Sequence, residues 1–387
     1  MLENGRLLIP DLPMGWLLLD KGTIQALGVG KSPHTDCLHI DANGNYISPG
    51  FIDIHVHGGG GHDFMDGSEK AMEQAAKTHM RHGTTALVPT TLCCPNEELL
   101  ATFDCYRSLK RNMKDGPALL GLHLEGPFFS REQIGAQDPV YLQKPTAENY
   151  LPLLDAGGND IVRMSVAVEL EGALALGDEL KRRGILASIG HSNAQYSEVQ
   201  QAVAHGYSHV THLYSGMSML RRMGAYRHLG IVESTYLMEE LTAEIICDGC
   251  HLPPELLQLI VKCIPKERLV LITDAMRGAD MPAGSKPLLG SLAHGQMTVI
   301  KDRVAFMPDG LSFAGSVCTT DRCVRVMTQQ GKTSLLDAVK MITETPARLM
   351  KVKKGKLAVG MDADICVFDE AIQIQRVFVG GVQTYMR

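Results

Sequence analysis

The sequence of 387 residues is 45% hydrophobic and 21% charged, with a formal net charge of −6. Its length accommodates one large barrel with a smaller attached domain, or two to three ordinary domains, and its composition excludes intrinsic disorder. The negative balance argues against nucleic-acid partners, although one or two arginines in a pocket suffice to bind an anionic small molecule.

Neither a membrane partner nor export is expected from the sequence. No apolar run reaches eighteen residues, and no basic flank precedes a long apolar segment at the N-terminus. The ten cysteines follow no regular framework, which indicates reduced thiols in a cytoplasmic protein. Cys93 and Cys94 are expected in the core.

The two ends of the chain, residues 1–48 and 355–387, show short alternating strands and turn signals such as Lys21-Gly22-Thr23 and Gly380-Gly381. Neither end contains a long helical pattern. We therefore expect the two ends to pair into one small β-sandwich domain beside a barrel domain of residues 49–354.

From about residue 50 onward, apolar β-rich runs alternate with amphipathic stretches such as Ser68–His82, the pattern of parallel strands linked by crossover helices. Eight such repeats predict a (β/α)8 barrel of the TIM type. After the eighth strand, the stretch Pro287–Asp309 predicts a hairpin excursion. The predicted strands are Phe51–His57, Ala86–Thr91, Leu119–Glu125, Val162–Val168, Leu186–His191, His209–Tyr214, Thr242–Cys247 and Leu269–Asp274.

Metal-ligand side chains gather where these strands end, which is where barrel enzymes carry their active sites. A His-x-His pair closes the first strand, and the period of two places both imidazoles on one face. One such histidine alone is more often a packing or surface residue, but several ligand types at strand ends are hard to explain by packing, because buried polar groups need partners. Zinc, iron or a similar divalent ion is indicated, and a bridging carboxylate could hold two ions. The candidate ligands are His55, His57, Glu125, His191 and His212.

Asp274, at the end of the eighth strand, allows two interpretations. It could cap a following helix, or it could be a general base beside the metal. We favour the base, because hydrolysis needs a proton taken from the attacking water and delivered to a poor amine leaving group.

Seven motifs together resemble the amidohydrolase superfamily and, more closely, its N-acetylglucosamine-6-phosphate deacetylase family. The resemblance covers nearly the whole chain. It rests on the stretches from Pro49 to Gly59, His123 to Phe128, Gly190 to Ser192, Thr211 to Tyr214, Asp248 to His251, Thr273 to Met276 and Ala314 to Ser316.

The resemblance implies hydrolysis of the acetamide of N-acetylglucosamine 6-phosphate to glucosamine 6-phosphate and acetate, with Asp274 as the acid/base. It implies one divalent ion on Glu125, His191 and His212 and a second where His55 and His57 are retained, with zinc first and iron, cobalt or manganese as alternatives. A homodimer is also implied. The implied substrate contacts are Ala136, Gln137, Ser215, Gly216, Arg227, Asp248, His251, Phe313, Ala314 and Gly315.

The chain departs from the family pattern around the substrate. Gln137 replaces a histidine that resembles a substrate contact, although its amide can still donate a hydrogen bond. Ser215-Gly216-Met217 replaces Asn-Ala-Met, and the phosphate motif Arg-Glu-Pro-Gly becomes Arg227-His228-Leu229-Gly230. In relatives that arginine reaches across a dimer interface. Arg221 and Arg222 are alternative phosphate ligands, although arginines on a loop are more often merely solvated.

Four other interpretations compete with this one. The Cys-x-x-Cys-His segment from Cys247 to His251 matches covalent haem attachment, which we reject because that chemistry belongs to exported proteins. An inert sugar-phosphate sensor would not need Asp274. A cyclic-amide hydrolase often uses a carboxylated lysine, where this chain has Glu125. A deacetylase for another hexosamine phosphate, such as N-acetylgalactosamine 6-phosphate, stays open.

Overall fold

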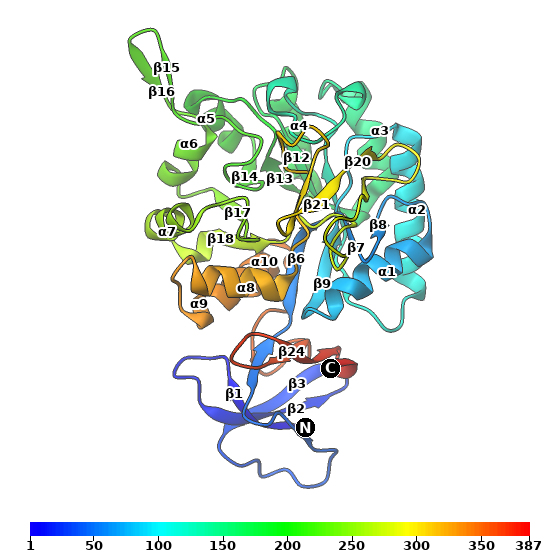
Figure 1. The fold of residues 1–387 in the computed structure, drawn as a ribbon, viewed down its shortest axis with the longest axis vertical. Helices are drawn as coiled ribbons and strands as arrows, with labels where there is room; N and C mark the ends of the chain where they lie inside the picture. The colour runs from blue at the N-terminus through cyan, green and yellow to red at the C-terminus, as the bar shows by residue number, and fades with distance from the viewer.

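The barrel predicted from the eight apolar runs is present in the computed structural model, which describes residues 1–387 (Figure 1). Its strands form two parallel sheets, in the orders β10-β9-β6 and β11-β12-β13-β14-β17-β18. Bridges from Thr90 to His123 and from Val56 to Ala275 join these sheets at both edges. The strands are β6 Phe51–Val56, β9 Thr84–Pro89, β10 Ala118–Leu119, β11 Leu122–Glu125, β12 Ile161–Val166, β13 Leu186–Ile189, β14 Tyr207–Val210, β17 Thr242–Ile246 and β18 Leu269–Ile272.

Helices surround the strands and cover their outer faces (Figure 1). The first shows how the sequence encodes them: the Ser68 side chain accepts a hydrogen bond from the amide of Ala71, and small apolar residues of one helix face are buried. The helices are α1 Glu69–Met80, α2 Asn96–Asn112, α3 Ala147–Gly157, α4 Ala173–Arg183, α5 Tyr196–Ala204, α6 Ile231–Leu237, α7 Pro254–Cys263, α8 Thr320–Gln329, α9 Leu335–Ile342 and α10 Glu344–Leu349.

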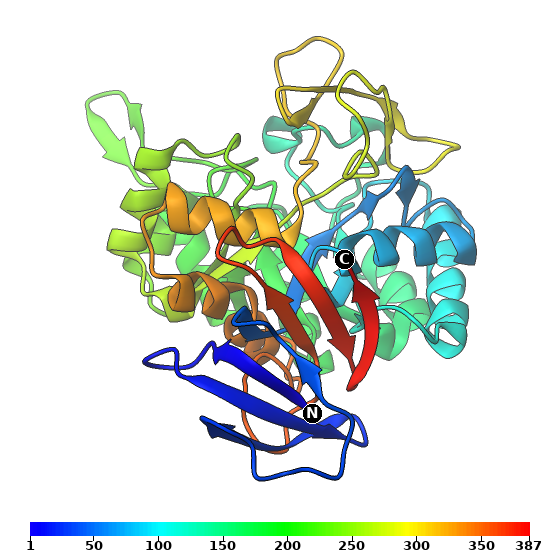
Figure 2. The same ribbon diagram turned by 60° about the horizontal axis from the view of Figure 1, so that its bottom comes forward.

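The two chain ends form one eight-stranded sheet, as the turn-rich flanks predicted (Figure 2). Antiparallel pairing of β5 with β23 joins the N-terminal strands to the C-terminal ones. The strands form a single sheet, and side chains of these strands, including Leu17, Ile47 and Phe378, make up a small core separate from that of the barrel. They are β1 Leu2–Leu7, β2 Met14–Asp20, β3 Thr23–Val29, β4 Ile40–Asp41, β5 Tyr46–Pro49, β23 Ile365–Phe368, β24 Ile374–Val379 and β25 Val382–Met386.

Short hairpins decorate the end of the barrel where the strands terminate. Strands β7 Gly58–Gly59 and β8 His62–Asp63 follow β6, and β15 Arg221–Met223 and β16 Tyr226–His228 form an arm that projects from the body in Figures 1 and 2. The predicted excursion after β18 contains β19 Leu288–Leu289, β20 Gln296–Met297, β21 Val299–Lys301 and β22 Val304–Phe306.

Cys93 and Cys94 are buried, as expected. No helix has the length and apolar character needed to span a bilayer.

A charged cluster ties the end of α1 to the rest of the barrel and should make stability depend on pH. His82 Nε2 lies 2.9 Å from Asp280 Oδ2, and its Nδ1 lies 3.3 Å from Asp321 Oδ1. Burial alone would lower the pKa of His82, but the two carboxylates raise it to about 9.

The stabilisation from charged His82 should be fully present below about pH 6.5, the pKa in the unfolded chain, and should disappear as the pH rises through about 9. We expect His82→Gln to lower the free energy of unfolding by about 1–2 kcal/mol at pH 6 and by much less at pH 9.5. Urea unfolding at both pH values measures this difference. Equal losses at the two values would contradict it.

Candidate active site

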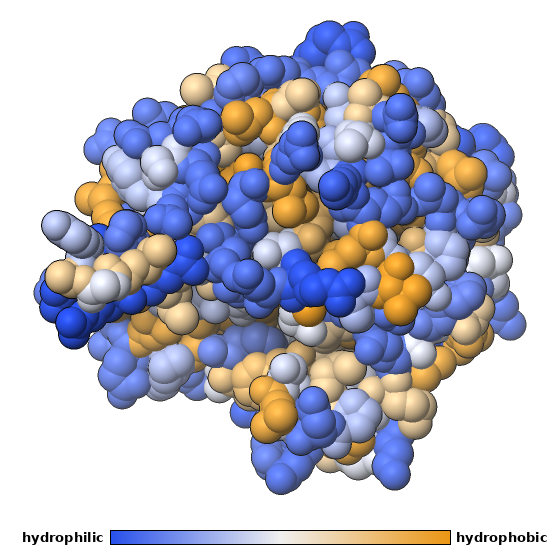
Figure 3. Space-filling view, turned by 90° about the horizontal axis from the view of Figure 1, so that it is seen from above, coloured by the Kyte–Doolittle hydropathy of each residue, from blue (hydrophilic) through white to orange (hydrophobic).

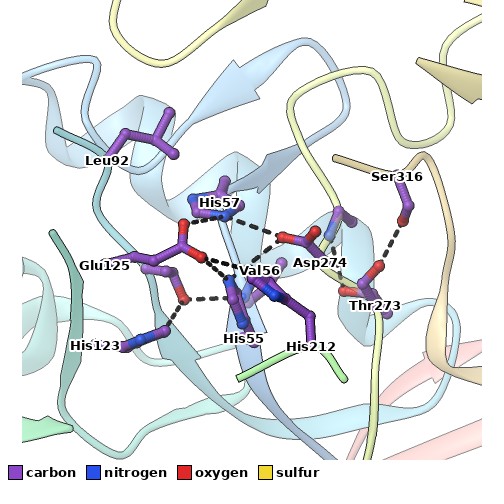
Figure 4. A network of polar contacts seen from close by, with 12 residues as sticks. His55, Val56, His57, Leu92, His123, Glu125, His212, Thr273, Asp274 and Ser316 are labelled. Carbon is purple, nitrogen blue, oxygen red and sulfur yellow. Dashed lines mark hydrogen bonds and ion pairs between the residues drawn. The ribbon is translucent and has the colours of Figure 1, made fainter. Parts of the chain in front are cut away.

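Six ionisable side chains converge at the strand ends. Figure 4 labels five of them: His55, His57, Glu125, His212 and Asp274. Glu125 is the last residue of β11, and His57 follows β6 directly, whereas His191, His212 and Asp274 lie two residues beyond β13, β14 and β18. These last three have positive φ angles of 47°, 27° and 48°, so the backbone leaves the strand there and turns each side chain inward. The predicted strands thus extend slightly too far.

Glu125 is the centre of the cluster. Its Oε1 lies 2.9 Å from His212 Nε2, 3.3 Å from His191 Nε2 and 3.3 Å from His55 Nε2. Its Oε2 lies 3.5 Å from His57 Nε2. Two buried groups able to hold a metal ion share this carboxylate: His55, His57 and Glu125 form one, and Glu125, His191 and His212 form the other.

Backbone carbonyls orient two of the imidazoles. His191 Nδ1 lies 2.9 Å from the carbonyl oxygen of Gln133, and His212 Nδ1 lies 3.1 Å from that of Ser215. A carbonyl only accepts hydrogen bonds, so each Nδ1 carries a proton, and Nε2, directed at Glu125, is the nitrogen that would bind a metal ion in place of its own proton. Both rings are therefore oriented as metal ligands would be.

The donor set fits divalent metal ions. His55 Nε2 and His57 Nδ1 are buried without a hydrogen-bond partner, and imidazole nitrogens with a shared carboxylate suit zinc and similar ions. Burial alone would lower the pKa of His55, but the negative charges of Glu125, Glu244 and Asp274 raise it to about 10. This concentration of negative charge around a buried imidazole favours any cation at the site.

Asp274 stands beside both members of the His-x-His pair. Its Oδ1 lies 3.1 Å from His57 Nε2 and 3.3 Å from His55 Nε2. Burial opposes ionisation, but these imidazoles keep the pKa of Asp274 below its usual value, so it can accept a proton. The helix-cap alternative is wrong, because no α-helix begins after Asp274 until Thr320.

A cavity of about 250 Å³ opens onto the cluster. Of the ten residues that the family resemblance implied as substrate contacts, seven line it together with His57, Glu125, His191, His212 and Asp274, whereas His55 is buried behind the lining. Asp248 and Ala314 lie behind the lining, and Arg227 is elsewhere. The seven are Ala136, Gln137, Ser215, Gly216, His251, Phe313 and Gly315.

Asp248 acts on the cavity through His251. Its Oδ2 lies 2.9 Å from His251 Nδ1, and its Oδ1 accepts hydrogen bonds from the amides of Cys250 and His251 at 2.8 and 2.9 Å. The carboxylate thereby takes one imidazole nitrogen and leaves His251 Nε2 available to a ligand. Cys247 is fully buried at the start of this segment, which further opposes haem attachment.

Gln137 uses its amide within the protein. Its Nε2 donates to Glu125 Oε2 at 2.8 Å, and its Oε1 accepts a hydrogen bond from the amide of Cys93 at 2.8 Å. The residue that replaces a family histidine therefore restrains the shared carboxylate, although it also lines the cavity. The sequence alone did not reveal this contact.

The geometry can now be set beside known proteins. The profile of the amidohydrolase family matches residues 46–384. The N-acetylglucosamine-6-phosphate deacetylase of Lysinibacillus sphaericus is 32% identical over 350 residues, which cover 88% of this chain and 86% of that protein. The chain belongs to this deacetylase family of amidohydrolases.

Two further members of the group bear on the substrate. The N-acetylgalactosamine-6-phosphate deacetylase of Escherichia coli O157:H7 is 30% identical over 339 residues, 87% of this chain and 86% of that protein. The deacetylase of Mycobacterium smegmatis, solved as an aspartate-to-alanine variant with N-acetyl-D-glucosamine 6-phosphate, has a TM-score of 0.88 and 28% identity, covering 96% of this chain and 95% of that one.

In this amidohydrolase, the three candidate phosphate-binding arginines lie outside the cavity. Arg227 and Arg222 are exposed on the β15–β16 arm and bind backbone carbonyls of the arm itself. Arg221 lies 3.4 Å from Asn193 Oδ1. Seen from above in Figure 3, the arm protrudes at the left edge of the molecule. None of the three lines the cavity.

Beneath the cluster lies a buried polar layer that the sequence analysis missed. His123 Nε2 lies 2.7 Å from Ser165 Oγ, and Arg163 is fully buried in an ion pair with Glu244. The period of two was the available signal, because it places His123 on the same strand face as Glu125 and Asp53 on the face of His55. Strand periodicity could not identify their partners, which come from other strands.

Proposed function

We propose that the chain hydrolyses the acetamide of N-acetylglucosamine 6-phosphate to glucosamine 6-phosphate and acetate. The observation that carries the proposal is the meeting of two groups able to hold metal ions and the Asp274 carboxylate at one cavity of about 250 Å³. The volume is of the order needed for a small polar ligand, at the lower end of the usual range for binding pockets.

His55, His57, Glu125, His191 and His212 would hold one or two divalent ions, with zinc as the first choice and iron, cobalt or manganese as alternatives. When bound, such an ion polarises the acetamide carbonyl and lowers the pKa of a water molecule. The buried, oriented imidazoles described above support this assignment.

Protein groups account for the remaining chemistry. Asp274 Oδ1 would take the proton of the attacking water and deliver it to the amine nitrogen as the C–N bond breaks. His251 Nδ1 donates to the Asp248 carboxylate, so its Nε2 can donate to the oxygen on which negative charge develops only when the ring carries both protons, a form that the adjacent carboxylate stabilises. Ala136, Ser215, Gly216, Phe313 and Gly315 line the space left for the sugar.

A second substrate is supported by a specific observation, the similarity to an N-acetylgalactosamine-6-phosphate deacetylase. Measuring acetate release from both 6-phosphates, at equal concentrations with metal-loaded protein, decides between the two epimers. No acetate from either sugar phosphate, with both bound, would instead indicate a sensor. The free thiols of all ten cysteines support a cytoplasmic location.

The phosphate would be met by Arg227 of a second subunit in a homodimer. The arm that carries Arg227 also exposes Met219, Leu220, Met223 and Tyr226, with 50%, 53%, 45% and 76% of their surfaces accessible. An apolar arm that projects from the body is expected to pack on a partner. A charge-assisted arginine–phosphate contact contributes about 2–3 kcal/mol when it is shielded from water.

Arg227→Ala should therefore lower kcat/KM for the 6-phosphate by about a hundredfold and leave kcat/KM for unphosphorylated N-acetylglucosamine nearly unchanged. Arg222→Ala, on the same arm, is the matched control for the arm's structure, and Arg221→Ala tests the remaining alternative. Activity should also fall on dilution below the dimer dissociation constant. If no arginine variant changes the phosphate preference, another group binds the phosphate.

A further inference from the structure

We infer that Glu244 is a positioning residue that aligns both metal-ligand groups from beneath, held in place by the buried Arg163. The inference rests on the proposed metal site, and it concerns a carboxylate of β17 that does not line the cavity. Glu244 and Arg163 are both fully buried.

The two carboxylate oxygens of Glu244 face different ways. Oε1 accepts a hydrogen bond from Arg163 Nη1, and Oε2 lies 3.1 Å from His55 Nδ1 and accepts from the backbone amide of His212 at 3.1 Å. His55 belongs to one ligand group and His212 to the other. One oxygen atom thus restrains a member of each group.

The contact to His55 sets the tautomer of the imidazole. An ionised carboxylate has no proton to give, so His55 Nδ1 must be the donor, and Nε2 is the nitrogen that would release its proton to bind a metal ion. That Nε2 faces Glu125 Oε1 and Asp274 Oδ1, each at 3.3 Å (Figure 4). Substitution of a buried carboxylate that orients a metal-binding histidine in this way typically weakens metal binding 10- to 100-fold.

The contact to His212 supports a strained backbone. His212 has φ of 27°, a conformation that a residue with a side chain rarely adopts, and its amide is held by Glu244 Oε2. The same turn directs His212 Nε2 to within 2.9 Å of Glu125 Oε1. Glu244 therefore helps to keep this ring in place without touching it.

Arg163 keeps Glu244 ionised and immobile. Its Nε donates to Ser188 Oγ at 3.1 Å, and its terminal nitrogens donate to the Ile54 carbonyl oxygen and to Thr211 Oγ1 at 3.1 and 3.0 Å. A guanidinium held on three sides fixes the carboxylate that pairs with it.

The first test compares Glu244→Gln with Tyr207→Phe, which removes one buried hydrogen bond, to the Ala173 carbonyl oxygen, and no contact of Glu244 or Arg163. Metal-free protein is titrated with Zn²⁺ against a chromophoric chelator, and folding is checked by circular dichroism. We expect Glu244→Gln to weaken at least one zinc site by about 10- to 100-fold, with Tyr207→Phe within about threefold of the wild type. Unchanged zinc affinities in Glu244→Gln would overturn the inference.

The second test uses the wild-type fold, in case Glu244→Gln does not fold. In zinc-loaded protein labelled with ¹⁵N-histidine, the His55 signals, identified by their loss in His55→Gln, should show a proton on Nδ1. A proton on Nε2 would refute the inference. If the wild type binds no divalent ion, it is the proposed function that fails.

Discussion

Glu125→Gln should abolish turnover by removing the only ligand that the two metal-binding groups share. The carboxylate lies within 3.5 Å of all four candidate imidazoles, and its pKa is held well below the usual range although burial opposes ionisation. Substituting a residue that hydrogen-bonds to a metal ligand typically weakens metal binding 10- to 100-fold. Losing a charged ligand itself should therefore weaken metal binding by about 100-fold or more at each site.

Elemental analysis after dialysis measures this result directly. Glu169→Gln is the matched control, because Glu169 accepts hydrogen bonds from Ser192 Oγ and the Asn193 amide at 2.5 and 2.6 Å but is not part of either ligand group. Wild-type metal content in Glu125→Gln would exclude the shared-carboxylate arrangement. Absence of transition metal from active wild-type protein would reject the metal site altogether.

Asp274→Asn should retain metal and fold but lower kcat by about a hundredfold or more, the scale of losing a general acid/base. The asparagine amide can occupy the same space beside His57 but cannot accept the proton of the attacking water. Asp274 is buried and belongs to neither metal-binding group, so its substitution should affect mainly the chemical step.

Turnover and metal content must be measured on the same preparation. Asp280→Asn is the control, because this carboxylate follows closely in sequence but pairs with His82 outside the cavity. Normal turnover in Asp274→Asn would remove Asp274 from the mechanism. Simultaneous loss of metal would make it chiefly a ligand.

Local patterns were sufficient for the barrel and for the chemical types of its site residues. Strands that are buried on both faces appear in the sequence as apolar runs, so all eight barrel strands were predicted. His55 and His57 share a face because side chains alternate along a strand. The predicted strands ended too late at His191, His212 and Asp274. The backbone turns to positive φ at these residues, and apart from glycine no residue type in the sequence reliably indicates such a turn.

The partners of those residues depended on the closed barrel. Glu244 meets His55 across 189 positions of sequence, and Arg163 meets Glu244 across 81. No local period encodes such pairs, because they form only when parallel strands are brought side by side by their crossover helices.

The sequence by itself therefore determined the fold class and the candidate metal ligands that the structure brings together. Tertiary structure decided how those residues are arranged. Glu125 is the carboxylate common to both groups able to hold a metal ion, and Gln137 hydrogen-bonds to Glu125. Arg227 lies on an arm outside the cavity of its own chain. The physical reason is that residue type and periodicity fix which face a side chain occupies, whereas its partners depend on long-range closure of the chain.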